Sequence, residues 1–330
     1  MKEKILITGG LGYVGSKFTE LYNSDYDLTV IDTNFYNSNT QNNVINILKD
    51  IRELELSDIK DIDYVVHMAE LSNDPLGELN PEITNEINHL GTIELLKLCE
   101  KSDIKKFIYM SSCSVYGKNP NLVNERSQLN PITNYSKAKV HNEEYLTSKK
   151  FPFETIILRN ATVFGHSNNL RLDLVINDLT YSAFKFKEIN LLSDGTPKRP
   201  FIHIVDLCRL IKLFLESTNN LNNEIFNIGS NQLNYSIYEI ANIIKDLLKI
   251  ESISIGKKDA DQRSYLVDFT KLNNFFPDFR FEFSVEKGID DMINKFKNFD
   301  YNANSIRVKH IKSNIERKKL DENLKWTNEQ

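Results

Sequence analysis

Residues 4–22 read KILITGGLGYVGSKFTELY, and this stretch decides the fold. Its apolar start predicts a buried strand, and its end predicts an amphipathic helix. Between them stand Gly9, Gly12 and Gly15, in the pattern G-x-x-G-x-x-G. Glycines at a strand-to-helix turn let the backbone approach a pyrophosphate, whose charge then rests at the helix N-terminus. The stretch therefore predicts the phosphate-binding turn of a dinucleotide-binding α/β fold.

An acidic residue ends the second predicted strand, LTVID (28–32). A carboxylate at Asp32 would accept hydrogen bonds from the adenosine ribose and repel a 2′-phosphate. No Arg or Lys occurs between Thr33 and Gln41. The sequence therefore favours NAD over NADP, and this context disfavours a plain βα turn without a ligand.

Short apolar runs alternate with helical patterns through the first half of the chain. Because strands alternating with helices form right-handed βαβ units, the pattern predicts a Rossmann-type, doubly wound parallel sheet of the α/β class. The clearest helix is expected over 85–102. The expected strands cover 4–8, 28–32, 63–69, 105–111 and 154–160.

The rhythm changes after about residue 165, which predicts a smaller, interleaved α/β substrate domain. The strand that opens FIHIVDLCRLIKLFLES (201–217) is expected to return to the main sheet. We therefore divide the chain into a NAD-binding domain, a smaller substrate-binding domain and a charged C-terminal tail. The first domain covers residues 1–165 and 201–234, and the second covers 166–200 and 235–300. The tail covers 301–330.

Bulk composition excludes some classes of protein. The 330 residues carry a formal net charge of −5, which argues against a general nucleic-acid binder because no basic excess is present to neutralise phosphates. No apolar run is long enough to span a membrane, and the N-terminus lacks a signal-peptide pattern. The three cysteines have no metal-ligand spacing and are expected to be reduced thiols of a cytoplasmic protein without a metal site.

Two polar clusters predict an active site. MSSCSVYG (110–117) follows a buried strand, and NYSKAKVHNEEYL (134–146) contains Tyr135 and Lys139 one helical turn apart. The lysine ammonium, together with oxidised nicotinamide, can depress the pKa of the tyrosine. The phenolate would then act as general base for alcohol oxidation, and the phenol as acid for the reverse step.

These motifs resemble the extended short-chain dehydrogenase/reductases, specifically the NAD-dependent nucleotide-sugar epimerase/dehydratase family. GGLGYVG, Asp32, DIR (50–52), HMA (67–69), SSCSVYG and YSKAK occur in order, followed by RPFIHIVDL (199–207), FNIGS (226–230) and RSYLVD (263–268). The resemblance covers roughly residues 1 to 295.

The resemblance implies a role for each matching residue. The catalytic residues would be Ser112, Tyr135 and Lys139. NAD would be held by Gly9, Gly12, Tyr13, Val14, Gly15, Asp32, Asp50, Ile51, Met68, Ala69 and Asn88, with Tyr135 and Lys139. A nucleotide-diphosphate sugar would be met by Ser112, Cys113, Ser114, Thr162, Asn177, Arg199, Arg263 and Tyr265. Family habit also implies a homodimer through the helices predicted at 85–102 and 134–146.

The residues after Ser112 bear on the reaction. Dehydratases of the family generally carry Asp-Glu there, whereas this chain has Cys113 and Ser114, which disfavours a 4,6-dehydratase. Enzymes that epimerise C3 and C5 can use a cysteine one residue later, at the Ser114 position. Two reactions at sugar C4 stay open: a 4-epimerase, which we favour, and a 4-dehydrogenase that releases the keto sugar. The stretch NATVFGHSNNLRLDLVINDLTY resembles enzymes acting on GDP-heptose at C4 and supports the second reading. A protein that binds NAD without turnover is the remaining alternative, and the intact catalytic residues argue against it.

Overall fold

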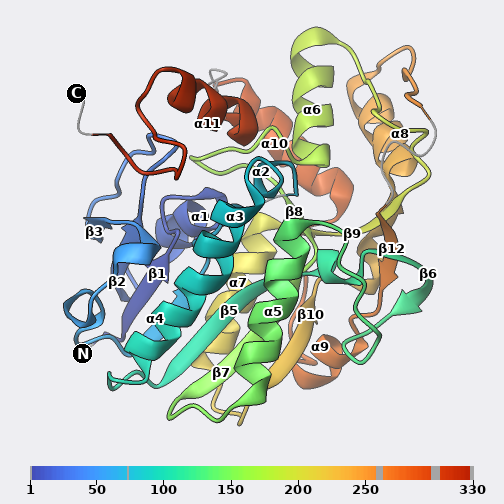
Figure 1. Ribbon diagram of the computed structural model, residues 1–330. Helices are drawn as coiled ribbons and strands as arrows, with labels where there is room; N and C mark the ends of the chain where they lie inside the picture. The colour runs from blue at the N-terminus through green and yellow to red at the C-terminus, as the bar shows by residue number, and fades with distance from the viewer. Residues whose placement is uncertain (1, 73, 258–262, 299–304, 328–330) are drawn as a thin grey trace.

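A seven-stranded parallel sheet forms the centre of the protein in the computed structural model, which describes residues 2–72, 74–257, 263–298 and 305–327 (Figure 1). The strand order is β10-β7-β5-β4-β1-β2-β3, so β1 lies between β4 and β2, and its Ile7 pairs with Val66 and Val30. This is the predicted Rossmann-type sheet. Its strands are β1 Lys4–Thr8, β2 Asp27–Asp32, β3 Ile45–Leu48, β4 Tyr64–His67, β5 Lys106–Ser112, β7 Glu154–Asn160 and β10 Glu224–Ile228.

Helices cover both faces of this sheet (Figure 1). Side chains alternate along each strand, so Ile5 and Ile7 join one hydrophobic cluster while Leu6 joins the other. One face is covered by α1 (Tyr13–Tyr22) and α7 (Ile204–Glu216). The other face carries α3 Pro81–Asn85, the π-helical turn η3 Glu86–Leu90, α4 Gly91–Cys99 and α5 Asn134–Ser148. The helix predicted over 85–102 is therefore interrupted by a π-helical turn.

Two small sheets lie beyond the carboxyl ends of the main strands. One contains β11 (Asn234–Ser236), β9 (Lys198–His203) and β8 (Thr162–Phe164), and the other pairs β12 (Ser264–Val267) with β6 (Lys118–Val123). The prediction that the strand at 201 returns to the main sheet is wrong, because β9 pairs with β8 and β11. Helices α6 Val175–Phe186, α8 Ile237–Leu248 and α10 Val285–Phe296 pack together above these sheets, and α2 Asp74–Gly77 and α9 Thr270–Phe275 are short.

The C-terminal segment is folded onto the N-terminal half of the main sheet. Helix α11 (Arg307–Glu316) lies beside α2 in the upper part of Figure 1. Ile311, Leu320 and Leu324 are buried in the same hydrophobic cluster as Leu6. The segment was predicted only as a charged tail because its apolar residues are few. Among the described residues, no helix has the length and apolar character to cross a membrane.

Candidate active site

The glycine turn joins β1 to α1 and approaches the backbone that follows β4. Gly9 has a φ of +72°, and a Cβ there would lie 2.8 Å from the Ala69 nitrogen. A Cβ on Gly15 would lie 2.5 Å from the Cα of Gly10. Side chains at these positions would therefore force the turn apart. The backbone N–H of Leu11 donates to Oδ2 of Asp32 at 3.0 Å, so the turn is tied to the acid that ends β2.

A cavity of about 1020 Å³ opens at the carboxyl ends of the main strands and contains most of the residues predicted to form the site. This is where open parallel sheets bind their ligands. The predicted residues that line it are Gly9, Gly12, Tyr13, Val14, Gly15, Asp32, Asp50, Ile51, Met68, Ala69, Ser112, Ser114, Tyr135, Lys139, Thr162, Arg199, Arg263 and Tyr265.

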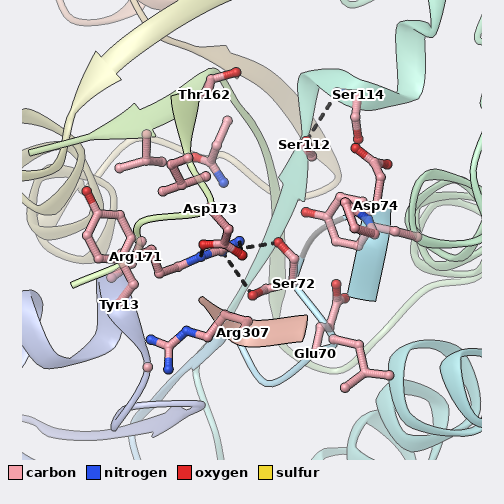
Figure 2. Close-up of a pocket in the computed structure, with 18 of the residues that line it drawn as sticks. Tyr13, Glu70, Ser72, Asp74, Ser112, Ser114, Thr162, Arg171, Asp173 and Arg307 are labelled. Atoms are coloured by element: carbon pink, nitrogen blue, oxygen red, sulfur yellow. Dashed lines mark hydrogen bonds and ion pairs between the residues drawn. The ribbon is translucent and has the colours of Figure 1, made fainter. Parts of the chain in front are cut away.

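Ser112, Tyr135 and Lys139 meet in this cavity. Ser112 ends β5, and its Oγ accepts a hydrogen bond from the backbone N–H of Ser114 at 3.1 Å (Figure 2). Tyr135 lies in the first turn of α5, and the Lys139 Nζ lies 5.4 Å from the centre of its ring. The ammonium also donates to the carbonyl of Met110. One strand end and one helical face thus hold a hydroxyl, a phenol and an ammonium together.

A carboxylate that the sequence analysis did not single out pairs with this lysine. Glu70 Oε2 lies 2.6 Å from the Lys139 Nζ, and the Glu70 side chain is 3% exposed. Its Oε1 accepts a hydrogen bond from the Tyr109 hydroxyl at 2.8 Å. Burial raises the pKa of Glu70, and Lys139 opposes that shift. The lysine therefore belongs to a buried ion pair.

This ion pair affects the proposed general base. Burial raises the pKa of Tyr135, and the negative charges of Glu70 and Asp74 raise it further. A hydrogen bond with Ser112 lowers it. The phenol is thus the stable form of Tyr135 in the protein without ligands, and a nearby positive charge is needed to favour the phenolate.

Arg199, Arg263 and Tyr265 come together in the wall of the cavity. The guanidinium of Arg199 lies 5.1 Å from the centre of the Tyr265 ring and donates to the Arg263 carbonyl. Arg263 forms an ion pair with Asp74, whose other oxygen accepts a hydrogen bond from Thr133. Two guanidinium groups thus line this part of the cavity.

Three predicted residues do not line the cavity. Asn88 lies in the π-helical turn, where its side chain bonds both the N–H and the carbonyl of Leu71. Asn177 accepts from the Gly165 N–H at 3.0 Å and donates to Tyr13 and Arg171. Both asparagines therefore form hydrogen bonds to residues that line the cavity without lining it themselves.

Cys113 is the third of these residues, and its thiol points away from the cavity. Its Sγ donates to the carbonyl of Arg159 at 3.2 Å, and burial raises its pKa. A protonated thiol in this position offers neither a base nor a contact to the sugar. The structure therefore corrects the expectation that Cys113 contacts substrate. Ser114 does line the cavity, and its buried Oγ has no hydrogen-bond partner among the described residues.

Several cavity residues were missed at the sequence level. Glu70 directly follows the HMA motif. A charged residue at the carboxyl end of a parallel strand, where ligands bind, could have indicated that it belongs to the site. Asn160 ends β7 and lines the cavity with a buried Oδ1 that has no partner among the described residues. Arg171 is paired with Asp173 at 2.9 Å and donates to Ser72 (Figure 2).

Comparison with known proteins identifies the family of this chain. The model of the "NAD dependent epimerase/dehydratase family" matches residues 5–229, which include the glycine turn, Ser112, Tyr135 and Lys139. The chain belongs to this family. It is thus an NAD-dependent enzyme of the extended short-chain dehydrogenase/reductase type.

Several relatives with full-length similarity carry epimerase names. A Methanocaldococcus jannaschii protein named "Putative UDP-glucose 4-epimerase" is 30% identical, over 89% of this chain and 98% of the relative. The structure of a UDP-N-acetylglucosamine 4-epimerase from Methanobrevibacter ruminantium is 27% identical, with a TM-score of 0.80, over 90% of this chain and 99% of that one. A Bacillus cereus UDP-glucuronic acid 4-epimerase was solved with UDP-glucuronic acid and NAD. It is 26% identical, with a TM-score of 0.79, over 89% of this chain and 99% of that one.

The residues of the cavity fit NAD. The glycine turn leaves no room for side chains between it and Ala69, and the N-terminus of α1 follows it directly. Asp32 stands where an adenosine ribose would be bound, while Asp50 and Ile51 line the neighbouring part of the cavity.

Proposed function

We propose that this enzyme is a nucleotide-sugar 4-epimerase. The observation that carries the proposal is the arrangement of proton-transfer groups around Tyr135. Glu70 is paired with Lys139 and Asp74 with Arg263, so both carboxylates whose charges act on Tyr135 are engaged in ion pairs. Tyr135 is then the group suited to exchange a proton with a sugar hydroxyl, which a 4-epimerase needs and a 4,6-dehydratase must supplement.

The roles of the residues follow from their contacts. NAD, when bound, supplies the hydride acceptor and donor for the sugar carbon. Tyr135 takes the proton of the C4 hydroxyl and later returns it, while Ser112 hydrogen-bonds the phenol and orients it. Lys139, fixed by Glu70 and the Met110 carbonyl, holds positive charge beside the ring of Tyr135.

The arginines in the cavity wall support a nucleotide-sugar substrate. Arg199 and Arg263 would bind the diphosphate of a nucleotide sugar, with Tyr265 packed against Arg199. Ser114 Oγ and Asn160 Oδ1, both buried and without partners among the described residues, are free to bind sugar hydroxyls.

The test is incubation of the purified enzyme with UDP-, GDP-, CDP- and dTDP-sugars. Product NMR and absorbance at the NADH band would be followed together. We expect one sugar to be converted to its C4 epimer without net NADH. A keto sugar formed in stoichiometric amount with NADH would instead establish the 4-dehydrogenase. NAD binding with no turnover of any sugar nucleotide would refute both.

A further inference from the structure

The C-terminal segment, residues 305–327, contacts the part of the cofactor site that follows β2. The Trp326 Nε1 donates to the carbonyl of Thr33 at 2.7 Å, directly after the acid that ends this strand. The His310 Nε2 lies 2.7 Å from the carbonyl of Phe35. Thr33 and Phe35 both line the cavity. The segment therefore holds the loop of Thr33 and Phe35, which forms one wall of the cavity, in place.

Arg307, the first residue of α11, reaches into the cavity from this segment. It is only 1% exposed and is among the residues that line the cavity, where Figure 2 shows it below Tyr13 and Arg171. Its Nη2 donates to the Asn169 Oδ1 at 2.7 Å, and its guanidinium lies 3.6 Å from the centre of the Tyr36 ring. Its Nη1 has no hydrogen-bond partner among the described residues.

The charge of Arg307 is incompletely compensated. Within the described part of the chain no carboxylate forms an ion pair with it, and burial lowers its pKa to about 10. Asp32 and Asp173 attract it from a distance, while Arg171 repels it. The guanidinium is still protonated at neutral pH. A buried cation with a free N–H is costly unless an anion completes the site.

The position of Arg307 identifies this anion. Asn169, which accepts from Arg307, donates through Nδ2 to the carbonyl of Leu11 at 2.6 Å. Leu11 lies inside the glycine turn, between Gly9 and Gly12. The Asn169 side chain thus links Arg307 to the glycine turn, whose backbone N–H groups can bind phosphates.

We propose that Arg307 binds a phosphate of the NAD pyrophosphate, and that segment 305–327 is a functional part of the cofactor site. The inference depends on the NAD site alone, so it holds whichever reaction the enzyme catalyses. A charge-assisted hydrogen bond of this kind strengthens binding by roughly tenfold to a hundredfold.

The experiment measures the affinities of ADP-ribose, NADP and UDP by calorimetry, without any turnover. We expect R307Q to weaken ADP-ribose by at least tenfold and to leave UDP unchanged, while R307K retains part of the affinity. R317Q is the matched control, because Arg317 is an exposed arginine of the same segment. Unchanged ADP-ribose affinity in a folded R307Q protein would overturn the proposal. A loss confined to UDP would assign Arg307 to the sugar nucleotide, and a loss confined to NADP would assign it to a 2′-phosphate; either result also overturns it.

The wild-type protein offers an independent readout in case R307Q does not fold. Trp326 is the only tryptophan of the chain, so its fluorescence reports on the C-terminal segment alone. It is 41% exposed and hydrogen-bonded beside the cofactor site. We expect ADP-ribose to reduce quenching of this fluorescence by acrylamide, and UDP to leave it unchanged. Quenching that is insensitive to ADP-ribose would contradict a role for the segment in cofactor binding.

Discussion

Replacing Glu70 by Gln should make Tyr135 ionise more readily. The Glu70 carboxylate lies 2.6 Å from the Lys139 ammonium, so at the tyrosine the two charges largely cancel. Gln is nearly the same size and can still accept the hydrogen bond from Tyr109. The substitution therefore removes one charge, leaves the packing in place, and exposes Tyr135 to an unpaired ammonium.

The size of this effect follows from the geometry. The Lys139 Nζ lies 5.4 Å from the centre of the Tyr135 ring. At an effective dielectric constant of about 20, a unit charge at this distance stabilises the phenolate by about 3 kcal/mol. That energy corresponds to roughly a hundredfold increase in the ionised fraction at a given pH. The residual field of the wild-type ion pair makes this an upper bound.

The assay is the pH dependence of kcat/KM. A general base acts when deprotonated, so kcat/KM rises with pH as the base loses its proton. A lower pKa moves this rising limb to lower pH, and we expect a displacement of more than about one pH unit in E70Q. Tyrosinate absorbance gives a second readout, taken as the difference between E70Q and the double variant E70Q/Y135F.

Two results would refute this reasoning. An unmoved rising limb would mean that Glu70 does not control the ionisation of Tyr135. Movement to higher pH would mean that Glu70 favours the ionisation of Tyr135 instead of opposing it. E82Q is the control, because Glu82 is an exposed carboxylate of α3 and should leave the profile unchanged.

Four further outcomes are expected. Y135F should abolish turnover while NAD stays bound, and retained turnover would disprove Tyr135 as the base. C113A should keep kcat within about twofold, because the thiol faces the Arg159 carbonyl; a large loss of kcat without a loss of stability would restore a chemical role to Cys113. E143Q breaks the buried pair of Glu143 with Arg159, 2.6 Å apart, and should cost about 3–5 kcal/mol in urea unfolding, against little change if the pair is dispensable. Light scattering should show a homodimer, for which we expect an interface made by η3, α4 and α5, since Leu90 of η3 is 48% exposed; a monomer would contradict this.

Local patterns were enough to predict the sheet and the catalytic end of the site. The glycine turn and the pair Tyr135 and Lys139 depend on neighbours within one strand-turn-helix unit or one helical turn, so their spacing is visible in the sequence. The assignment of β9 failed because a short apolar strand does not encode its partner. Pairing with β8 is a long-range choice that packing decides.

Residues whose role depends on distant contacts escaped prediction. Glu70 is significant because Lys139 lies against it, and these residues are far apart in the chain. Arg307 looked like one cation among many in a charged tail. Its burial depends on Asn169 and Tyr36, which no local period connects to it. Cys113 and Asn177 show the reverse case, since motif positions placed them in the site while side-chain direction turned them away from the cavity.

The bonds between the glycine turn and the loop after β8 have a consequence for building chimeric enzymes. Tyr13 donates to the Gly165 carbonyl at 2.6 Å, and the hydroxyls of Ser16 and Ser167 lie 2.8 Å apart. A graft that exchanges sugar pockets at the predicted domain border, residue 165, would therefore sever contacts that hold the cofactor turn in shape. A crossover that keeps 165–177 and the C-terminal segment 305–327 with the N-terminal half would leave these contacts in place, together with those of Asn177 to Tyr13 and of Arg307 to Asn169.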